Sequence, residues 1–225
     1  MAALLPLPVG APLLAAAVLL LVPGRRWLHR VLGLGTSATV LAVGGLLLAA
    51  TLPGGRVLSE DIGGWPPGVA ITMAVDPFSA LMLCVSALLV ALCLGYADAT
   101  GPGRHRLFTP LALALSAGAY GAYLTADLFN LFVFVEVMLA PSYALLVLAG
   151  GRRRVAAGRV YLTANLMAST VFLAGIGLTY GVAGAVNLGD LAGAARRSTA
   201  VAMAVAVVLL ALVAKAALVP LHTWL

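Results

Sequence analysis

The sequence predicts an all-α integral membrane protein, a bundle of about seven transmembrane helices in one membrane domain over residues 1–225. Of the 225 residues, 63% are hydrophobic and 9% are charged, whereas soluble chains are about one quarter charged. A helix that crosses a bilayer needs about 20 apolar residues, so a chain of this length has no room for a sizeable water-soluble domain. The formal net charge of +6 comes from short basic segments between apolar blocks, which argues against a continuous nucleic-acid-binding patch.

Seven apolar runs predict the spans, and we place them near residues 4–22, 31–52, 76–97, 107–125, 128–149, 157–181 and 200–219. The first run lacks the basic leader of a signal peptide, so we interpret it as a retained span. Asp76 and Pro77 are suited to begin the third helix as its N-cap and first turn. Pro220 lacks an N–H donor and disfavours helical angles at Val219, so we expect the seventh helix to be interrupted near Pro220.

The longest connection shows no sign of a separate domain, and the weakly polar residues in two spans predict close packing between helices. Residues 53–75 contain Pro53-Gly54-Gly55, Gly63-Gly64 and Pro66-Pro67, which favours irregular structure over the membrane surface. Spans four and six carry small or weakly polar residues, which favour close helix packing and, as the weaker alternative, the lining of a pathway. These residues are Pro110, Ser116, Gly118, Gly121, Thr163, Asn165, Ser169, Thr170, Gly175 and Gly177.

Arginine residues are distributed unequally between alternate connections. One set of connections carries nine of them and the other set carries three. Because positive residues accumulate on the cytoplasmic side, we place the nine-arginine side inside, the N-terminus outside and the C-terminus of this chain in the cytoplasm. The nine are Arg25, Arg26, Arg30, Arg104, Arg106, Arg152, Arg153, Arg154 and Arg159, and the three are Arg56, Arg196 and Arg197.

Patterns typical of enzymes and metal sites are weak in this sequence. Cys84 and Cys93 are nine residues apart, about 180° around a helix, so they face opposite ways and are interpreted as packing residues. The sequence offers no plausible nucleophile–base set, no glycine-rich phosphate loop after a strand and no zinc-ligand spacing. We therefore expect no catalytic residue, no cofactor and no metal site in this chain.

Two acidic residues mark the fifth span. Asp127 stands at its start, where an acidic side chain can cap the helix; capping is favoured there over a place in a pathway. Glu136 lies nine residues further on, or about 13 Å along the helix, near the middle of a hydrocarbon core about 30 Å thick. Because a charge at that depth is costly, Glu136 is a candidate functional residue. The alternative is a protonated glutamic acid bonded to a neighbouring helix.

Lys215 is the natural partner of Glu136. It is the only lysine, and it lies inside the apolar run before Pro220. An interrupted helix would expose backbone carbonyls beside it, an arrangement found at ion sites in transporters. The alternative is that Pro220 simply ends the span and Lys215 reaches to the interface.

The choice of lysine over arginine suits proton movement, because a buried lysine can lose its proton and arginine effectively cannot. The hypothesis is that Glu136 and Lys215 form an ion pair whose making and breaking moves a proton. His222, just beyond the break, titrates in a range that could connect the lysine to cytoplasmic water, although a lone histidine at a span end is more often an interface residue.

Two segments resemble a known family. DLFNLFVFVEVMLAPSYALLVL at 127–148 and KAALVPLHTWL at 215–225 look like the fifth and the broken seventh span of the proton-translocating antiporter-like subunits. This family is shared by Mrp-type cation/proton antiporters and respiratory complex I. Within it, the resemblance is strongest to the D subunit of the Mrp antiporters. Segments 62–82 and 180–192 support the resemblance, which covers nearly the whole chain.

The resemblance implies roles for individual residues. Glu136 corresponds to the family's span-five glutamate and Lys215 to its span-seven lysine. Pro220, His222 and Trp224 correspond to the stretch after the break. It also implies a bacterial cell membrane location, work beside other membrane subunits in a hetero-oligomeric complex, and protons and monovalent cations, Na⁺ above all, as the transported ions. Because family members are about twice as long and carry a second, inverted repeat, we expect this chain to be an N-terminal half.

Alternatives remain beside a cation/proton antiporter subunit. One is a proton-pumping membrane subunit of complex I or of a membrane hydrogenase, which the loop segments favour less. Another is a membrane scaffold without an ion path, in which Glu136 and Lys215 form a structural pair. A single-polypeptide carrier would need a cluster of polar residues for its substrate, and the sequence shows none.

Overall fold

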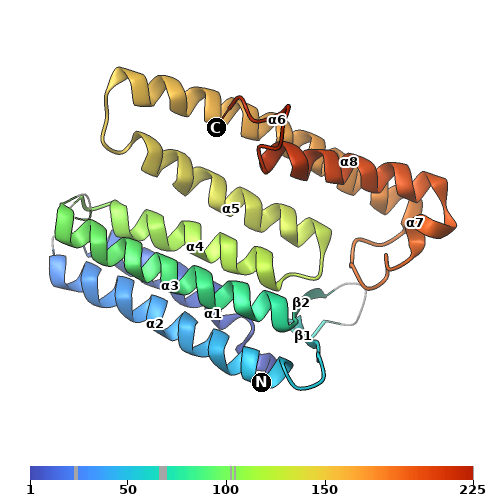
Figure 1. Ribbon diagram of the computed structural model, residues 1–225, viewed down its shortest axis with the longest axis horizontal. Helices are drawn as coiled ribbons and strands as arrows, with labels where there is room; N and C mark the ends of the chain where they lie inside the picture. The colour runs from blue at the N-terminus through green and yellow to red at the C-terminus, as the bar shows by residue number, and fades with distance from the viewer. Residues whose placement is uncertain (23–24, 66–69, 102, 104, 225) are drawn as a thin grey trace.

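The computed structural model describes residues 1–22, 25–65, 70–101, 103 and 105–224. Its long helices run side by side in a bundle, with α1–α4 on one side, α5 next to them and α6 and α8 beyond (Figure 1). A short 3₁₀ turn, Ala2–Leu4, precedes the first helix. The helices of the described part are α1 (Leu7–Leu21), α2 (Arg26–Thr51), α3 (Pro77–Thr100), α4 (Phe108–Leu124), α5 (Leu128–Val147), α6 (Arg152–Ala183), α7 (Ala194–Arg197) and α8 (Thr199–Lys215).

The expected class, a helical multi-pass membrane protein, is confirmed. Five helical segments are long and apolar enough to cross a membrane: residues 2–21, α2, α3, α5 and α6. The helices α4 and α8 are apolar but have 17 residues each, so the count of seven spans stays a prediction. Of these two, α4 packs on α1 and α5, and α8 packs on α6.

Small residues let these helices approach closely, as the packing interpretation of spans four and six predicts. A Cβ atom added to Gly118 of α4 would lie 2.8 Å from the carbonyl oxygen of Phe134 in α5. A Cβ atom added to Gly175 of α6 would lie 2.9 Å from the backbone nitrogen of Val208 in α8. At both places a larger residue would have to push a neighbouring backbone away.

The connection over residues 53–75 is not irregular throughout, which corrects the expectation. Residues Leu58–Ile62 (β1) and Ile71–Val75 (β2) form an antiparallel hairpin, with Glu60 opposite Met73. The apolar residues of β2 alternate, and Met73 and Val75 are buried, which is the period-two pattern of a half-buried strand. The surrounding glycines obscured this pattern: Gly54, Gly55, Gly63 and Gly64 have positive φ and form turns. Pro66-Pro67 lies outside the described residues.

The hairpin ties helix ends together at one end of the bundle. The backbone N–H of Ala126 donates to the carbonyl of Thr72 at 3.0 Å. The side chain of Asn187 donates to the Thr72 hydroxyl at 3.2 Å, and that hydroxyl donates to Asp61 at 2.7 Å. The segment before α5, the loop after α6 and the hairpin are thus held in fixed positions, and Asp76 caps α3 beside them by accepting from the N–H of Ser79 at 2.7 Å.

The helix connections that carry most arginines meet at the opposite end. The α1–α2, α3–α4 and α5–α6 connections lie together, and the hairpin, the α4–α5 connection and α7 lie at the other end (Figure 1). Successive helix connections therefore alternate between the two ends of the bundle, as the unequal distribution of arginines between alternate connections predicts. Arg104 lies outside the described residues, and which end faces the cytoplasm stays a prediction.

The helix break comes earlier than expected, and Pro220 does not set it. Helix α8 ends at Lys215, and Ala217 takes a left-handed conformation with φ of 52°. The N–H of Leu218 bonds the carbonyl of Val213 at 3.3 Å, and the N–H of Ala217 bonds the carbonyl of Ala214 at 3.2 Å. This pair of bonds is the Schellman motif, which terminates a helix by local hydrogen bonding. Lys215 is therefore the last residue of α8 instead of lying inside it.

Candidate functional site

The N-terminus of α5 is fixed by Asp127. This residue is 9% exposed, and its carboxylate accepts from the backbone N–H of Asn130 at 2.8 Å. The side chain of Asn130 in turn donates to the Thr125 hydroxyl at 3.0 Å. Asp127 thus has the geometry of a helix cap, and among the described residues no hydrogen bond or ion pair joins it to Glu136.

Glu136 lies near the middle of α5, with its side chain 29% exposed. Its neighbour across the helix interface is α6, where Tyr161, Asn165 and Ser169 follow one another at intervals of four residues. Residues at this spacing share one helix face. That face of α6 therefore carries a row of polar groups opposite the one acidic side chain within α5.

Lys215 completes the site from the end of α8. Its side chain is 10% exposed, and its Nζ lies 3.5 Å from Oε1 of Glu136. The same Nζ donates to Oγ of Ser169 at 2.7 Å. The expected pairing of Glu136 with Lys215 is thus present in the structure, and both of its members reach the same serine hydroxyl.

Ser169 bridges the two charged groups. Its hydroxyl accepts from Lys215 and donates to Oε1 of Glu136. It also lies 2.8 Å from the carbonyl oxygen of Asn165, to which it can donate instead. A serine hydroxyl has one proton, so Ser169 can direct it to Glu136 or to Asn165, but not fully to both.

A cavity of about 280 Å³ lies beside the ion pair. Lys215 lines one part of it, and Ser142, Tyr161 and Trp224 line another. Ser142 and Tyr161 are hydrogen-bonded to each other at 2.7 Å, and both lie closer to the α5–α6 connection than Glu136 and Ser169 do. The cavity therefore extends from the ion pair towards the arginine-rich end of the bundle.

The early end of α8 makes room for this cavity. Helix α8 begins beyond the last residues of α6, runs back along it and stops near its middle, beside Ser169 (Figure 1). The chain after the end of α8 then packs on the part of α6 that α8 does not reach. The indole N–H of Trp224 donates to the carbonyl of Ala214 at 3.0 Å, and its ring meets Tyr161 edge to face with centroids 5.5 Å apart.

The role of His222 stays a prediction. It is exposed in the turn after α8, and the residues that line the cavity include Trp224 but not His222. Pro220 lies in the same turn, beyond the true end of the helix. Among the described residues, no group of three His, Cys, Asp or Glu side chains could hold a metal ion.

The sequence identifies the two charges more readily than the residues that connect them. For Ser169 and Asn165 it favours close helix packing, with the lining of a pathway as the weaker alternative, and the family resemblance places Trp224 in the stretch after the break. Tyr161 and Ser142 carry no expectation. The interval of four between Tyr161, Asn165 and Ser169 was a usable signal, because it predicts one polar stripe. It becomes informative only when α5 and α8 are known to face that stripe.

Comparisons with known proteins found one matching family model and several similar proteins. A family model described as "NADH:quinone oxidoreductase/Mrp antiporter, TM" matches residues 125–225. The chain is 40% identical to the D subunit of a probable K⁺/H⁺ antiporter of Rhizobium meliloti, over 99% of this chain and 43% of that protein. It is 32% identical to the D subunit of a Na⁺/H⁺ antiporter of Bacillus subtilis, over 97% of this chain and 45% of that protein.

A solved structure is similar over the same extent. A chain in the Mrp complex from Dietzia sp. DQ12-45-1b superposes with a TM-score of 0.95 and 46% identity, covering 99% of this chain and 42% of that one. The chain spans a little under half the length of the curated relatives it matches. It belongs to the family of antiporter-like membrane subunits that Mrp antiporters share with respiratory complex I.

Proposed function

We propose that this chain is part of the D subunit of a monovalent cation/proton antiporter complex, in which Glu136, Ser169 and Lys215 carry the proton. The observation that supports the proposal most is the ion pair itself: a carboxylate and an ammonium group share one hydroxyl near the middle of the bundle, beside a cavity. Buried ionisable residues of this kind are costly in a membrane and are usually functional.

The proton would move in three steps. When Glu136 takes up a proton, its carboxylate becomes neutral and loses its attraction for the ammonium group. Lys215 can then release a proton to water in the cavity and become a neutral amine. Transfer of the proton from Glu136 to the amine restores the ion pair, so that one proton has entered at Glu136 and one has left at Lys215.

Ser169 suits this transfer because its hydroxyl contacts both groups. In the charged state it donates to the Glu136 carboxylate and accepts from Lys215. Once Glu136 is protonated and Lys215 is a neutral amine, the serine proton can turn from Glu136 to the nitrogen of Lys215, which lies 2.7 Å away. The hydroxyl oxygen then accepts the proton of Glu136 as its own proton passes to Lys215, so the serine can relay a proton instead of only holding the pair.

The transported cation is Na⁺ in our proposal, with K⁺ as the other test ion. The relative from Bacillus subtilis is named for Na⁺ and the relative from Rhizobium meliloti for K⁺. We propose other membrane subunits of the same complex as partners, and a bacterial cell membrane as the location with the arginine-rich end inside. The nine-to-three arginine distribution supports this orientation.

The test is proton exchange by the assembled complex in sealed vesicles. A pH-sensitive dye reports the change in internal pH when Na⁺ or K⁺ is added to vesicles that hold a proton gradient. We expect exchange in the unaltered complex, and its loss in Glu136→Gln and in Lys215→Arg, because the first removes the carboxylate and the second fixes the positive charge. Asp190→Asn, an exposed acid far from the pair, is the matched control and should retain exchange.

The alternatives predict other results. A scaffold without an ion path predicts full exchange in Glu136→Gln. A proton-pumping subunit of complex I, which the family description also covers, predicts proton movement that depends on NADH and quinone and not on Na⁺ or K⁺. Full exchange in Lys215→Arg would exclude the proposed release of a proton from Lys215.

A further inference from the structure

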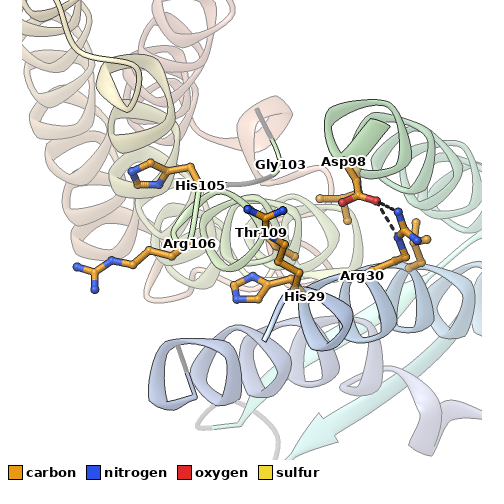
Figure 2. A pocket seen from close by; sticks show the side chains of 11 residues that line it. His29, Arg30, Asp98, Gly103, His105, Arg106 and Thr109 are labelled. Carbon is orange, nitrogen blue, oxygen red and sulfur yellow. Dashed lines mark hydrogen bonds and ion pairs between the residues drawn. The ribbon is translucent and has the colours of Figure 1, made fainter. Parts of the chain in front are cut away.

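A second cavity lies at the arginine-rich end of the bundle, away from the ion pair. It has a volume of about 290 Å³ and is enclosed by the start of α2, the end of α3 and the start of α4. Figure 2 shows His29 and Arg30 from α2 and Asp98 from α3, with His105 and Arg106 before α4. The proposed proton path uses none of these residues.

The cavity carries an excess of positive charge. Arg30 is paired with Asp98: the Nε of Arg30 donates to the carboxylate of Asp98 at 2.7 Å. Asp98 is the single acidic side chain among the described residues that line the cavity. Arg26 and Arg106 also line it, and both are exposed. Three arginines and one aspartate therefore leave two positive charges of the arginines unpaired by an acidic side chain among the described residues that line the cavity.

An apolar hollow adjoins this basic cavity. It has a volume of about 190 Å³ and is lined by Leu19, Leu20 and Leu107, together with Arg106. Arg106 therefore belongs to both spaces, and Figure 2 shows its side chain extending away from the Arg30–Asp98 pair. The exposed indole of Trp27 lies at the same end of α2, where aromatic side chains mark the boundary between lipid and water.

We propose that the two spaces together bind one anionic phospholipid. Its phosphate lies in the basic cavity near Arg26 and Arg106, and an acyl chain lies along Leu19, Leu20 and Leu107. Basic pockets between membrane helices bind anionic headgroups, and arginine recognises phosphate through several N–H donors. Inorganic phosphate would use the basic cavity alone, so the apolar hollow across Arg106 favours the lipid as its source.

The proposal is independent of the proton path and of the orientation of the bundle. It requires only that this end of the helices lies at a membrane surface, where headgroup and acyl chain meet. Either leaflet supplies a phospholipid at that depth. A complex that exchanges no protons could still bind the lipid, and a complex without the lipid site could still exchange them.

The experiment measures lipid retained by the complete subunit in its delipidated complex, by native mass spectrometry during titration with phosphatidylglycerol. The test variant combines Arg26→Gln with Arg106→Gln. The matched control combines Arg152→Gln with Arg153→Gln, two exposed arginines at the same end of the bundle but outside the cavity. Because each arginine near an anionic lipid contributes about fivefold to binding, the loss of two should weaken the binding of phosphatidylglycerol by about 25-fold.

Two further ligands separate the sources of the phosphate. Phosphatidylcholine should bind more weakly than phosphatidylglycerol, and inorganic phosphate should not displace phosphatidylglycerol at millimolar concentration. Equal retention by the test variant and the control would overturn the proposal. So would equal binding of phosphatidylcholine, displacement by inorganic phosphate, or no retention of phosphatidylglycerol by the unaltered complex, as when another subunit covers the cavity.

Discussion

Ser169 is the residue that hydrogen-bonds to both charged groups of the candidate site. It is 5% exposed, and its hydroxyl contacts Glu136, Lys215 and the carbonyl of Asn165. A methyl group in its place leaves a carboxylate and an ammonium group 3.5 Å apart without a relay between them. The proton would then have to pass between Glu136 and Lys215 without a bridging hydroxyl group.

We therefore predict that Ser169→Ala slows proton exchange by the assembled complex. A hydrogen bond to a charged group contributes about 1.5–3 kcal/mol, so the rate should fall by about tenfold or more. Thr170→Ala is the control, because Thr170 is exposed and its hydroxyl bonds only the carbonyl of Leu166. An unchanged rate in Ser169→Ala, measured by the vesicle assay, would show that Ser169 only packs.

Glu136 and Lys215 could be predicted from the sequence because their burial is expensive. A charged residue inside an apolar run is costly unless it has a partner, and two such residues of opposite charge can be partners in an ion pair. Ser169 could not be found in this way, because a serine in a membrane helix satisfies its hydroxyl on its own helix backbone at little cost. Its role depends on which helices face it, and single-sequence periodicity does not contain that information.

At the scale of elements, the end of α8 decides the shape of the site. The sequence draws attention to Pro220, but the helix has already ended five residues earlier, at Lys215. The cause is the backbone conformation of Ala217, and alanine gives no sequence signal for a helix end. The β-hairpin was missed for a related reason, since its short strands lie between glycine-rich turns that dominate the local pattern.

The left-handed conformation of Ala217 leads to a prediction about stability. Glycine takes φ of 52° without the penalty that a Cβ atom brings, and that penalty is about 1–2 kcal/mol. Ala217→Gly should therefore raise the thermal midpoint of the purified complex. Ala216→Gly is the control: its φ of −77° suits alanine, so glycine there should lower the midpoint. A lower midpoint in Ala217→Gly would contradict the Schellman motif.

At the scale of the whole molecule, the bundle has two chemically different ends. One end gathers the connections with nine arginines, and the other holds the hairpin and α7. The alternation of these connections could be predicted from the sequence, because it follows from counting apolar runs. The pairing of helices could not, because every long helix is apolar over most of its surface and does not specify its neighbours.

The orientation of the bundle can be tested with single cysteines. In a background with Cys84→Ala and Cys93→Ala, the test protein carries either Arg153→Cys at the start of α6 or Asp190→Cys in the connection after α6, both at exposed positions. A membrane-impermeant maleimide should label Asp190→Cys in intact cells and Arg153→Cys only after lysis, because arginines collect on the cytoplasmic side. The reverse pattern would place the cavity beside Lys215 on the outer side.

The position of Lys215 at the very end of α8 has an electrostatic consequence. Aligned peptide groups give the C-terminus of a helix a partial charge of roughly −0.5, which attracts a nearby cation. Because α8 stops beside Ser169, this charge lies within the bundle instead of at the membrane surface. The ammonium group is thus attracted by the helix end as well as by Glu136. In the proposed mechanism, neutralising Glu136 would therefore weaken the attraction on Lys215 without leaving that cation alone in an apolar interior.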